Sequence, residues 1–446
     1  MATATEGRKE DKDLVVSLYE LAVGEEDARL CRDISDAHCN DQPRNFLLQS
    51  AALSLSKIGD GLADAKVVLP WLLAVLGAPG FFIGMLVPVR ESLALLPQML
   101  FGSAVRRYAV RKWFWVAGSL AQGGSVLLMA LVAGLGMEGA AAGWTVLALL
   151  VVQSLARGVS SVASKDTLGK TVAKRKRGRV NGYASSISGV VTGLTGLYLI
   201  FTPEEGRSDL LLFGMIAAAG CSWLLGAATY AAIEEHPGAT DGGRGLKEVL
   251  ADQLRDLLRE PDLQRFLLAR SLLLCSAFSG PIYVALAQRN LGSDIATLGL
   301  LVVATGIAGA VSSSVWGALS DRSSRKTMML GAALTGVLAA ATLALAASGS
   351  GLVGSLWLYG VLLFVLGIAH AGVRIGRKTH LVDMAGEDKR SQYVALSNSA
   401  IGVILLVFGA VIGAVMSISL LWALAAIAVT ALLALLATAR LGEAQD

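Results

Sequence analysis

Ionisable residues interrupt the apolar stretch 45–76, which is long enough to cross a bilayer. Lys57, Asp60 and Asp64 fall within about 60° of one helix face, and Ser50 lies near the same line. A charge at bilayer depth costs on the order of 3 kcal/mol unless it faces protein, water or a partner. We therefore expect this face to border a polar cavity. The charged residues on this face then form either a structural salt bridge or a site that binds protons or substrate.

The charges on this face do not balance, because one cation cannot compensate two carboxylates. One of Asp60 and Asp64 is therefore expected to hold a proton or to meet another cation. The next apolar stretch supplies Arg90 as a partner for Asp60 or Asp64, and Glu91 as a partner for Lys57, unless both are purely structural. Adjacent helix residues point about 100° apart, so Arg90 and Glu91 cannot pair with each other. As proton carrier we rank Asp60 first, Asp64 second and Glu91 third, with Lys57 as their modulating cation.

Two later apolar stretches carry polar residues at helical spacing. The fourth stretch contains Gln153, Arg157, Ser160, Ser161 and Ser164, and the tenth contains His370, Arg374, Arg377 and Lys378. Arginine binds carboxylate or phosphate in a bidentate way, so Arg157 and Arg374 predict a solute with an anionic group. His370 either titrates near neutral pH or hydrogen-bonds across helices. The candidates for substrate binding are Arg157, Arg374, His370, Gln153, Arg270 and Arg90.

Composition places these residues in a polytopic, all-α membrane protein. The chain has 446 residues, of which 54% are hydrophobic and only 16% charged, and its mean hydropathy is +0.62. Soluble domains have about 25% charged residues. About twelve spans are predicted: 46–75, 80–102, 113–134, 143–164, 180–201, 210–232, 264–288, 296–319, 327–347, 353–376, 392–416 and 418–438. The chain begins with a polar segment that does not resemble a cleaved signal peptide.

Lysine and arginine concentrate in alternate loops, which orients the chain. They follow the second, fourth, eighth and tenth spans, whereas the opposite loops 77–80 and 136–143 contain almost none. The positive-inside rule then places both termini in the cytoplasm of a multi-pass plasma-membrane protein, which we expect to be in a bacterial inner membrane. Because the basic residues are confined to these loops, the pI of about 8.8 does not indicate nucleic-acid binding.

The chain also repeats itself. Residues 164–189 parallel 377–402 at an offset of about 213 residues. An even number of spans per repeat preserves orientation, so two parallel six-helix halves are predicted. The expected order is a tail (1–44), a first half (45–232), a linker with an amphipathic helix at 246–260 (233–263), a second half (264–440) and a short tail (441–446).

The N-terminal tail contains one weak helical pattern, with Leu14, Leu18 and Leu21 on a shared face. We expect this helix to lie on the membrane surface or on the cytoplasmic side of the protein itself. His38 and Cys39, further along the tail, are expected to be solvated, because they offer too few ligands for a metal site.

One loop motif resembles a known family. Residues 317–326 read GALSDRSSRK and resemble the signature loop of the major facilitator superfamily, G-x-L-(A/S)-D-R-x-G-R-(R/K), with Ser324 in place of the glycine. The matching position after the second span, 102–112, keeps Arg-Lys but lacks the aspartate. The resemblance implies that spans 1, 4, 7 and 10 line a central cavity. It also implies a cytoplasmic latch in which Asp321 faces Arg179. The gating residues are then Asp321, Arg322, Arg325 and Arg179.

A secondary transporter that works by alternating access is the leading functional hypothesis. The chain has no P-loop and no evident catalytic constellation, so we expect neither ATP drive, nor a cofactor, nor an enzyme. The expected partners are the lipid bilayer, a small-molecule substrate and H⁺, with Na⁺ as the alternative ion, and we expect a monomer. Two alternatives stay open: a proton-coupled exporter of amphipathic or cationic compounds, and a non-transporting membrane assembly factor. The fifth span lacks the Gly-Pro pair of many such exporters.

Overall fold

The computed structural model describes residues 14–24, 34–96, 104–203, 208–238, 240 and 260–444, apart from the side chains of 313–314 and 386–392. The first half contains α3 (Asp36–Leu62), α4 (Val68–Val75), α5 (Gly80–Leu95), α7 (Lys112–Gly134), α8 (Gly139–Thr171), α9 (Arg177–Phe201) and α10 (Asp209–Ala231). The second half contains α12 (Pro261–Leu272), α13 (Cys275–Leu291), α14 (Ile295–Arg322), α15 (Ser324–Ala347), α16 (Leu356–Met384), α17 (Gly386–Ile418) and α18 (Leu420–Ala439). A short apolar helix, Leu14–Val23, precedes them, and the expected linker helix lies outside the described residues except for Glu260.

The helices confirm an all-α polytopic architecture. Among the described residues, ten helices are long and apolar enough to cross a membrane. The other two of the twelve expected spans correspond to α3 together with α4, and to α5. Lys57, Asp60, Asp64, Arg90 and Glu91 lie on these two spans. α5 has only 16 residues, and α4 only eight, so neither helix is long enough to cross a membrane by itself.

The first span is not the continuous helix that the sequence suggested. α3 ends at Leu62 and α4 begins at Val68, so the chain is non-helical between them. A carboxylate oxygen of Asp64, Oδ1, accepts hydrogen bonds from the backbone N–H groups of Lys66 (2.8 Å) and Val67 (3.0 Å). Asp64 therefore stabilises the turn that leads from the break into α4, in the way that aspartate side chains stabilise many turns. Irregular backbone at membrane depth is tolerated where it lines a cavity.

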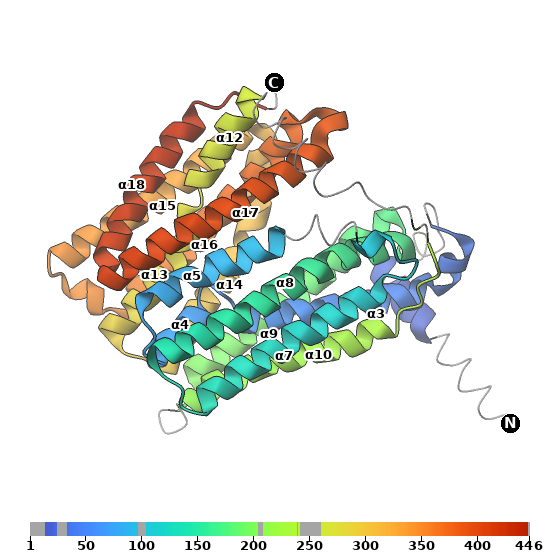
Figure 1. The fold of residues 1–446 in the computed structure, drawn as a ribbon, viewed down its shortest axis with the longest axis horizontal. Coiled ribbons are helices and arrows are strands. Elements are labelled where there is room, and N and C mark those ends of the chain that lie inside the picture. Colours follow the sequence, from blue (N-terminus) through green and yellow to red (C-terminus); the bar gives the residue numbers. More distant parts are fainter. Residues whose placement is uncertain are drawn as a thin grey trace.

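Two helix pairs join the halves: α5 packs along α17, and α9 packs along α14 (Figure 1). At the end of the molecule away from the start of α3, α4 also contacts α13, and Gln288 Nε2 donates to the carbonyl of Trp71 at 3.1 Å. From there the two halves diverge toward the end where α3 begins and α18 ends (Figure 1). We call this the terminal end, and the opposite end the closed end.

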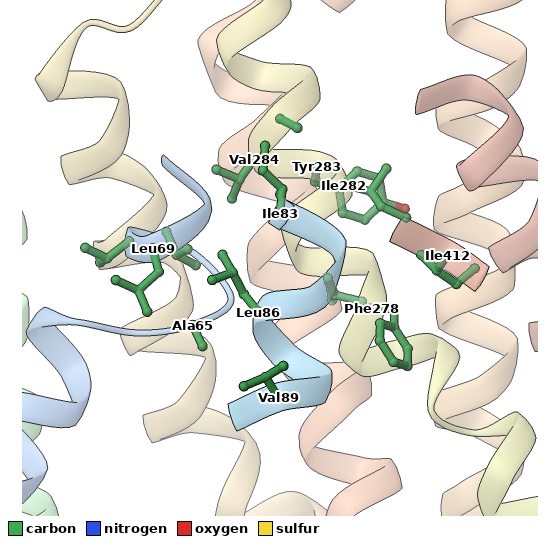
Figure 2. Packing of buried hydrophobic residues seen from close by; sticks show 14 of the residues in the cluster. Ala65, Leu69, Ile83, Leu86, Val89, Phe278, Ile282, Tyr283, Val284 and Ile412 are labelled. Carbon is green, nitrogen blue, oxygen red and sulfur yellow. The ribbon is translucent and has the colours of Figure 1, made fainter. Parts of the chain in front are cut away.

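Buried apolar side chains of both halves meet at the closed end (Figure 2). Leu69, Ile83 and Leu86 come from α4 and α5, and Phe278 and Ile282 come from α13. Inside a membrane, packing of this kind is driven mainly by van der Waals contact, because lipid is as apolar as the side chains. The contact holds the break in the first span directly beside α13.

Candidate functional site

Asp60 lies at the centre of a charged cluster formed by three helices. Its Oδ1 accepts from Arg90 Nη2 of α5 at 2.6 Å and from Arg157 Nη1 of α8. Arg90 also donates through Nη1 to Gln153 Oε1 of α8 at 2.5 Å. The Asp60–Arg90 contact proposed from sequence is therefore present, and Arg157 is a second cation on the same carboxylate. One aspartate thus joins α3, α5 and α8.

This cluster borders a first cavity of about 210 Å³. Its charged lining residues are three carboxylates and three cations: Asp60, Asp64, Glu91, Lys66, Arg90 and Arg157. Asp60 is bonded by two arginines and Asp64 by two backbone amides. Glu91 is exposed to the cavity and forms no ion pair within 4.0 Å among the described residues. Glu91 is therefore the carboxylate most accessible to a mobile ion.

A second cavity of about 280 Å³ adjoins the first at Asp64 and Lys66, and residues of both halves line it. Lys66 Nζ lies 2.9 Å from His370 Nε2, and Ser276 Oγ lies 3.1 Å from His370 Nδ1. Arg374 also lines this cavity, is exposed, and forms no ion pair among the described residues. The break in the first half thus contacts α16 of the second half through polar groups.

The family model of the Major Facilitator Superfamily matches residues 266–444, and the whole chain shares its fold with solved transporters. The second half of the chain is therefore similar to the major facilitator superfamily. Its fold resembles that of the nucleoside transporter NupG, with a TM-score of 0.65 and 12% identity over 89% of this chain and 99% of that one. It also resembles a D-xylose–proton symporter, with a TM-score of 0.63 and 11% identity over 90% and 98% of the chains. A bacterial homologue of the iron transporter ferroportin, in an inward-facing state, gives a TM-score of 0.61 and 16% identity over 89% and 98%.

No curated protein sequence matches this chain. At such low identities, the solved structures establish the fold alone. The roles of individual residues must therefore come from its own geometry.

Lys57 does not neutralise the span-1 carboxylates as expected. Its Nζ donates to Ser185 Oγ at 2.6 Å and to the Asn181 carbonyl at 3.3 Å, both on α9. Because the side chain extends across to α9, neither Asp60 nor Glu91 pairs with it. Lys66 occupies the cavity instead. The sequence pattern missed Lys66 because a continuous helix would place it about 200° from Asp64; only the break brings it to the cavity.

The expected substrate-binding residues separate into three places. Arg90, Gln153 and Arg157 form the Asp60 cluster, and His370 and Arg374 line the second cavity. Arg157 and Arg374 thus border adjacent cavities from opposite halves. Arg270 lines neither: it is buried on α12 and donates to Ser397 Oγ and Asn398 Oδ1 of α17. These contacts give Arg270 a packing role between α12 and α17.

The gating residues show a different latch from the expected one. Asp321 and Arg322 are exposed, and Arg179 donates to the carbonyl of Val23 in the N-terminal helix. Arg325 pairs with Glu443 at 2.9 Å, and Ser323 Oγ donates to the same carboxylate. The Asp321–Arg179 contact is absent here, where the halves diverge, and it stays a prediction for the opposite conformation.

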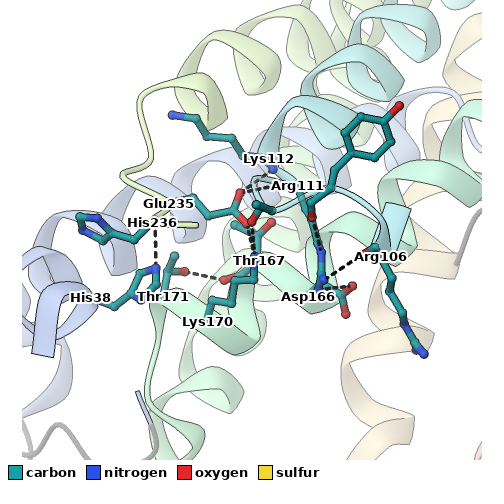
Figure 3. Close-up of polar contacts among 12 residues, drawn as sticks. His38, Arg106, Arg111, Lys112, Asp166, Thr167, Lys170, Thr171, Glu235 and His236 are labelled. Carbon is teal, nitrogen blue, oxygen red and sulfur yellow. Dashed lines mark hydrogen bonds and ion pairs between the residues drawn. The ribbon is translucent and has the colours of Figure 1, made fainter. Parts of the chain in front are cut away.

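In the first half, Glu235 binds the residues at the start of α7 (Figure 3). Its buried carboxylate accepts the backbone N–H groups of Arg111 (2.8 Å) and Lys112 (2.6 Å) and Lys170 Nζ (2.9 Å). Arg111 also pairs with Asp166 at 3.0 Å. Glu235 follows α10 as Glu443 follows α18, so an acidic residue after the last helix stabilises the start of the third span in both halves.

The region around His38 is buried rather than solvated. His38 Nδ1 lies 2.8 Å from Ser35 Oγ, and its Nε2 accepts the backbone N–H of His236 at 3.1 Å. Cys39 is disulfide-bonded. The expectation of a solvated tail was wrong because α3 begins at Asp36, well before the apolar stretch, and packs against the segment after α10.

Proposed function

We propose that this protein is a secondary active transporter that moves a small organic solute with an anionic group by alternating access. The observation that carries the proposal is the contact between Lys66 of the first half and His370 of the second, at adjoining cavities lined by charged side chains. Ionisable side chains that face a cavity inside a membrane protein commonly mark the path of an ion or a solute. A scaffold or assembly factor has no need of them.

Following the positive-inside rule, we propose that the terminal end faces the cytoplasm and that the membrane is a bacterial inner membrane. The α4–α13 contact would then close the protein toward the outside, and the diverging halves would open it inward. Rocking of the halves about the α5–α17 and α9–α14 interfaces would expose the cavities to each side in turn.

Protons are the coupling ion we propose, with Na⁺ as the alternative. A D-xylose–proton symporter shares the fold, so the fold accommodates proton coupling. Asp60, Asp64 and Glu91 remain the candidate carriers. Glu91 now ranks first, because Asp60 and Asp64 already have two donors each whereas Glu91 has no ion-pair partner among the described residues.

Replacing Glu91 with Gln tests the carrier. We expect Glu91→Gln to abolish accumulation driven by a pH gradient and to leave solute exchange at equal pH largely intact, because the amide cannot release a proton. The measurement is solute flux in proteoliposomes, and Glu138→Gln, on the loop before α8, is the matched control. If Glu91→Gln accumulates solute as well as the unmodified protein does, Asp60 becomes the leading candidate for the proton carrier.

The solute class is best found by a screen that needs no labelled compound. Proteoliposomes that contain a pH-sensitive dye are exposed to carboxylates, nucleosides, pentoses and quaternary ammonium compounds. Proton flux with an anionic solute supports the proposal. Flux only with ammonium compounds would favour a cation exporter, for which the exposed carboxylate of Glu91 is the supporting observation. No flux with any class, and no counterflow, would favour the assembly factor.

A further inference from the structure

The second cavity differs in chemistry from one end to the other. Its walls are apolar, with Val68, Val302, Leu363 and Leu366 among them. Polar groups gather at the end where Lys66, His370 and Arg374 lie. We propose that this cavity binds a monocarboxylate with an apolar body, and that Lys66 and Arg374 hold its carboxylate. The proposal rests on the proposed transport function for its biological purpose, but binding is measured independently of transport.

The walls offer little to a polyhydroxylated solute. Thr305 Oγ1 donates to the carbonyls of Leu301 and Val302, and Ser276 Oγ donates to the carbonyl of Leu273. Thr192 Oγ1 is the one buried hydroxyl of the described cavity wall that has no partner. A sugar or nucleoside would leave several hydroxyl groups without partners, and each buried unpaired hydroxyl weakens binding. The apolar body of a solute has no such hydroxyl groups, so it can enter the cavity without this loss of hydrogen bonds.

The polar end is arranged to receive an anion. A lysine ammonium can only donate hydrogen bonds, so His370 must accept from Lys66 through Nε2. His370 then donates from Nδ1 to Ser276, which fixes a neutral tautomer. Lys66 is therefore held by a neutral partner, and a bound carboxylate would replace that contact with an ion pair. Such a pair is stronger in a poorly solvated site than in water.

The local charge matches a single negative group. The charged residues that line this cavity are Lys66, Arg374 and Asp64. Two cations against one carboxylate leave one positive charge. A monoanion neutralises this end of the cavity, whereas a dianion would leave an uncompensated negative charge.

The test is calorimetric binding to the full-length chain in detergent. The carboxylate probes are butyrate, hexanoate and 3-phenylpropionate, and each is compared with its neutral amide. Uridine and D-xylose serve as the polyhydroxylated probes. We expect at least one carboxylate to bind, and its amide to bind at least roughly tenfold more weakly, since bonds to charged groups contribute about 1.5–3 kcal/mol. Lys66→Gln and Arg374→Gln should each weaken binding by a similar factor, whereas Lys326→Gln, an exposed cation at the terminal end, should change it less than about twofold.

Several results would overturn the inference: no carboxylate binds, the amide binds as well as its acid, or both cavity variants bind like the unmodified protein. The comparison of acid with amide needs no variant, so it holds even if a substitution prevents folding. If the flux screen identifies a nucleoside or pentose and no carboxylate binds, this inference fails and transport stands. If carboxylates bind but no solute moves, the proposed function fails and the binding site stands.

Discussion

Asp60 illustrates what a buried charge requires of its neighbours. Its side chain is 20% exposed, and those of its partners Arg90 and Arg157 are 10% and 36% exposed. One carboxylate thus compensates two guanidinium groups that water reaches only in part. Removing one partner of a buried pair is costly because the other charge stays in place.

We expect Asp60→Asn to lower the free energy of unfolding by about 3 kcal/mol, the lower end for a broken buried pair because water reaches part of the cluster. Adding Arg157→Gln should cost less than its single-variant effect, since that cation has already lost its partner. Thermal unfolding in detergent measures both. Asp262→Asn is the matched control, because the Asp262–Arg265 pair is exposed and should contribute little. If Asp60→Asn and Asp262→Asn lowered the free energy of unfolding equally, the stabilising role of the Asp60 cluster would be contradicted.

His38 makes the junction between α3 and the segment after α10 sensitive to pH. Burial, followed by the neighbouring His236 and Lys170, lowers the pKa of His38 from its usual 6.5, against the opposing carboxylates of Glu235 and Asp41. The folded junction therefore favours neutral His38. Its stability is complete above 6.5 and falls as the pH drops from there through the lowered pKa.

We expect the backbone amides of Glu234, His236 and Gly238 to lose hydrogen-exchange protection as the pH falls well below 6.5, because protonated Nε2 cannot accept the His236 N–H. In His38→Asn this additional loss of protection on acidification should disappear. Protection that is identical in both proteins at every pH would show that His38 does not titrate in this range.

The N-terminal helix Leu14–Val23 docks on the protein through a face that the hydrophobic pattern did not identify. Leu14 and Leu21 are 60% and 86% exposed, whereas Tyr19 is 1% exposed. The Tyr19 ring contacts Phe46 at a centroid distance of 5.3 Å, and its hydroxyl accepts from Lys176 Nζ at 2.6 Å. An aromatic ring with one polar atom suits this site better than leucine, because the buried Lys176 needs an acceptor.

Tyr19→Ala should release this helix, since removal of a buried aromatic ring costs about 3–5 kcal/mol. Tyr19→Phe should loosen it less, because only the bond to Lys176 is lost. Hydrogen exchange of amides 14–23 provides the measurement, and Leu21→Ala is the control with an exposed side chain. If Leu21→Ala loosens the helix as much as Tyr19→Ala, then the helix docks through its leucine face.

The halves meet where glycines allow two helices to approach closely. A Cβ atom at Gly84 of α5 would lie 2.5 Å from the Cα of Gly413 in α17, and backbone cannot yield to it. The same helix pair is one of the two interfaces about which the halves would rock. Close packing through small residues is a common way to join helices in a membrane.

Gly84→Val is expected to destabilise the protein by about 1–3 kcal/mol, as overpacking does elsewhere. The matched control is Gly124→Val in α7, where an added Cβ meets no atom within 4 Å. Thermal unfolding of the two variants separates the interface effect from the general effect of valine in a helix. Equal midpoints would show that α5 and α17 can separate at this point without cost.

The sequence alone determined the spans, their halves and the presence of charge in the first span. α9 at 177–201 and α10 at 209–231 begin and end within three residues of the predicted spans 180–201 and 210–232. Hydropathy and helical periodicity are local properties, and the bilayer sets the length of each span. The sequence also predicted that Arg90 meets Asp60 or Asp64 if the first two spans pack as a hairpin, and the structure selects Asp60.

The tertiary structure alone decided which charges meet. Lys57 and Lys66 both lie near the carboxylates in sequence, but the break after Leu62 directs Lys66 toward His370 of the other half, while Lys57 contacts α9. Arg270 and Arg374 both belong to predicted cavity helices, yet only Arg374 lines a cavity. The partner of a buried charge depends on helix rotation, on local breaks and on the packing of distant segments, and the periodicity of a single helix contains none of these.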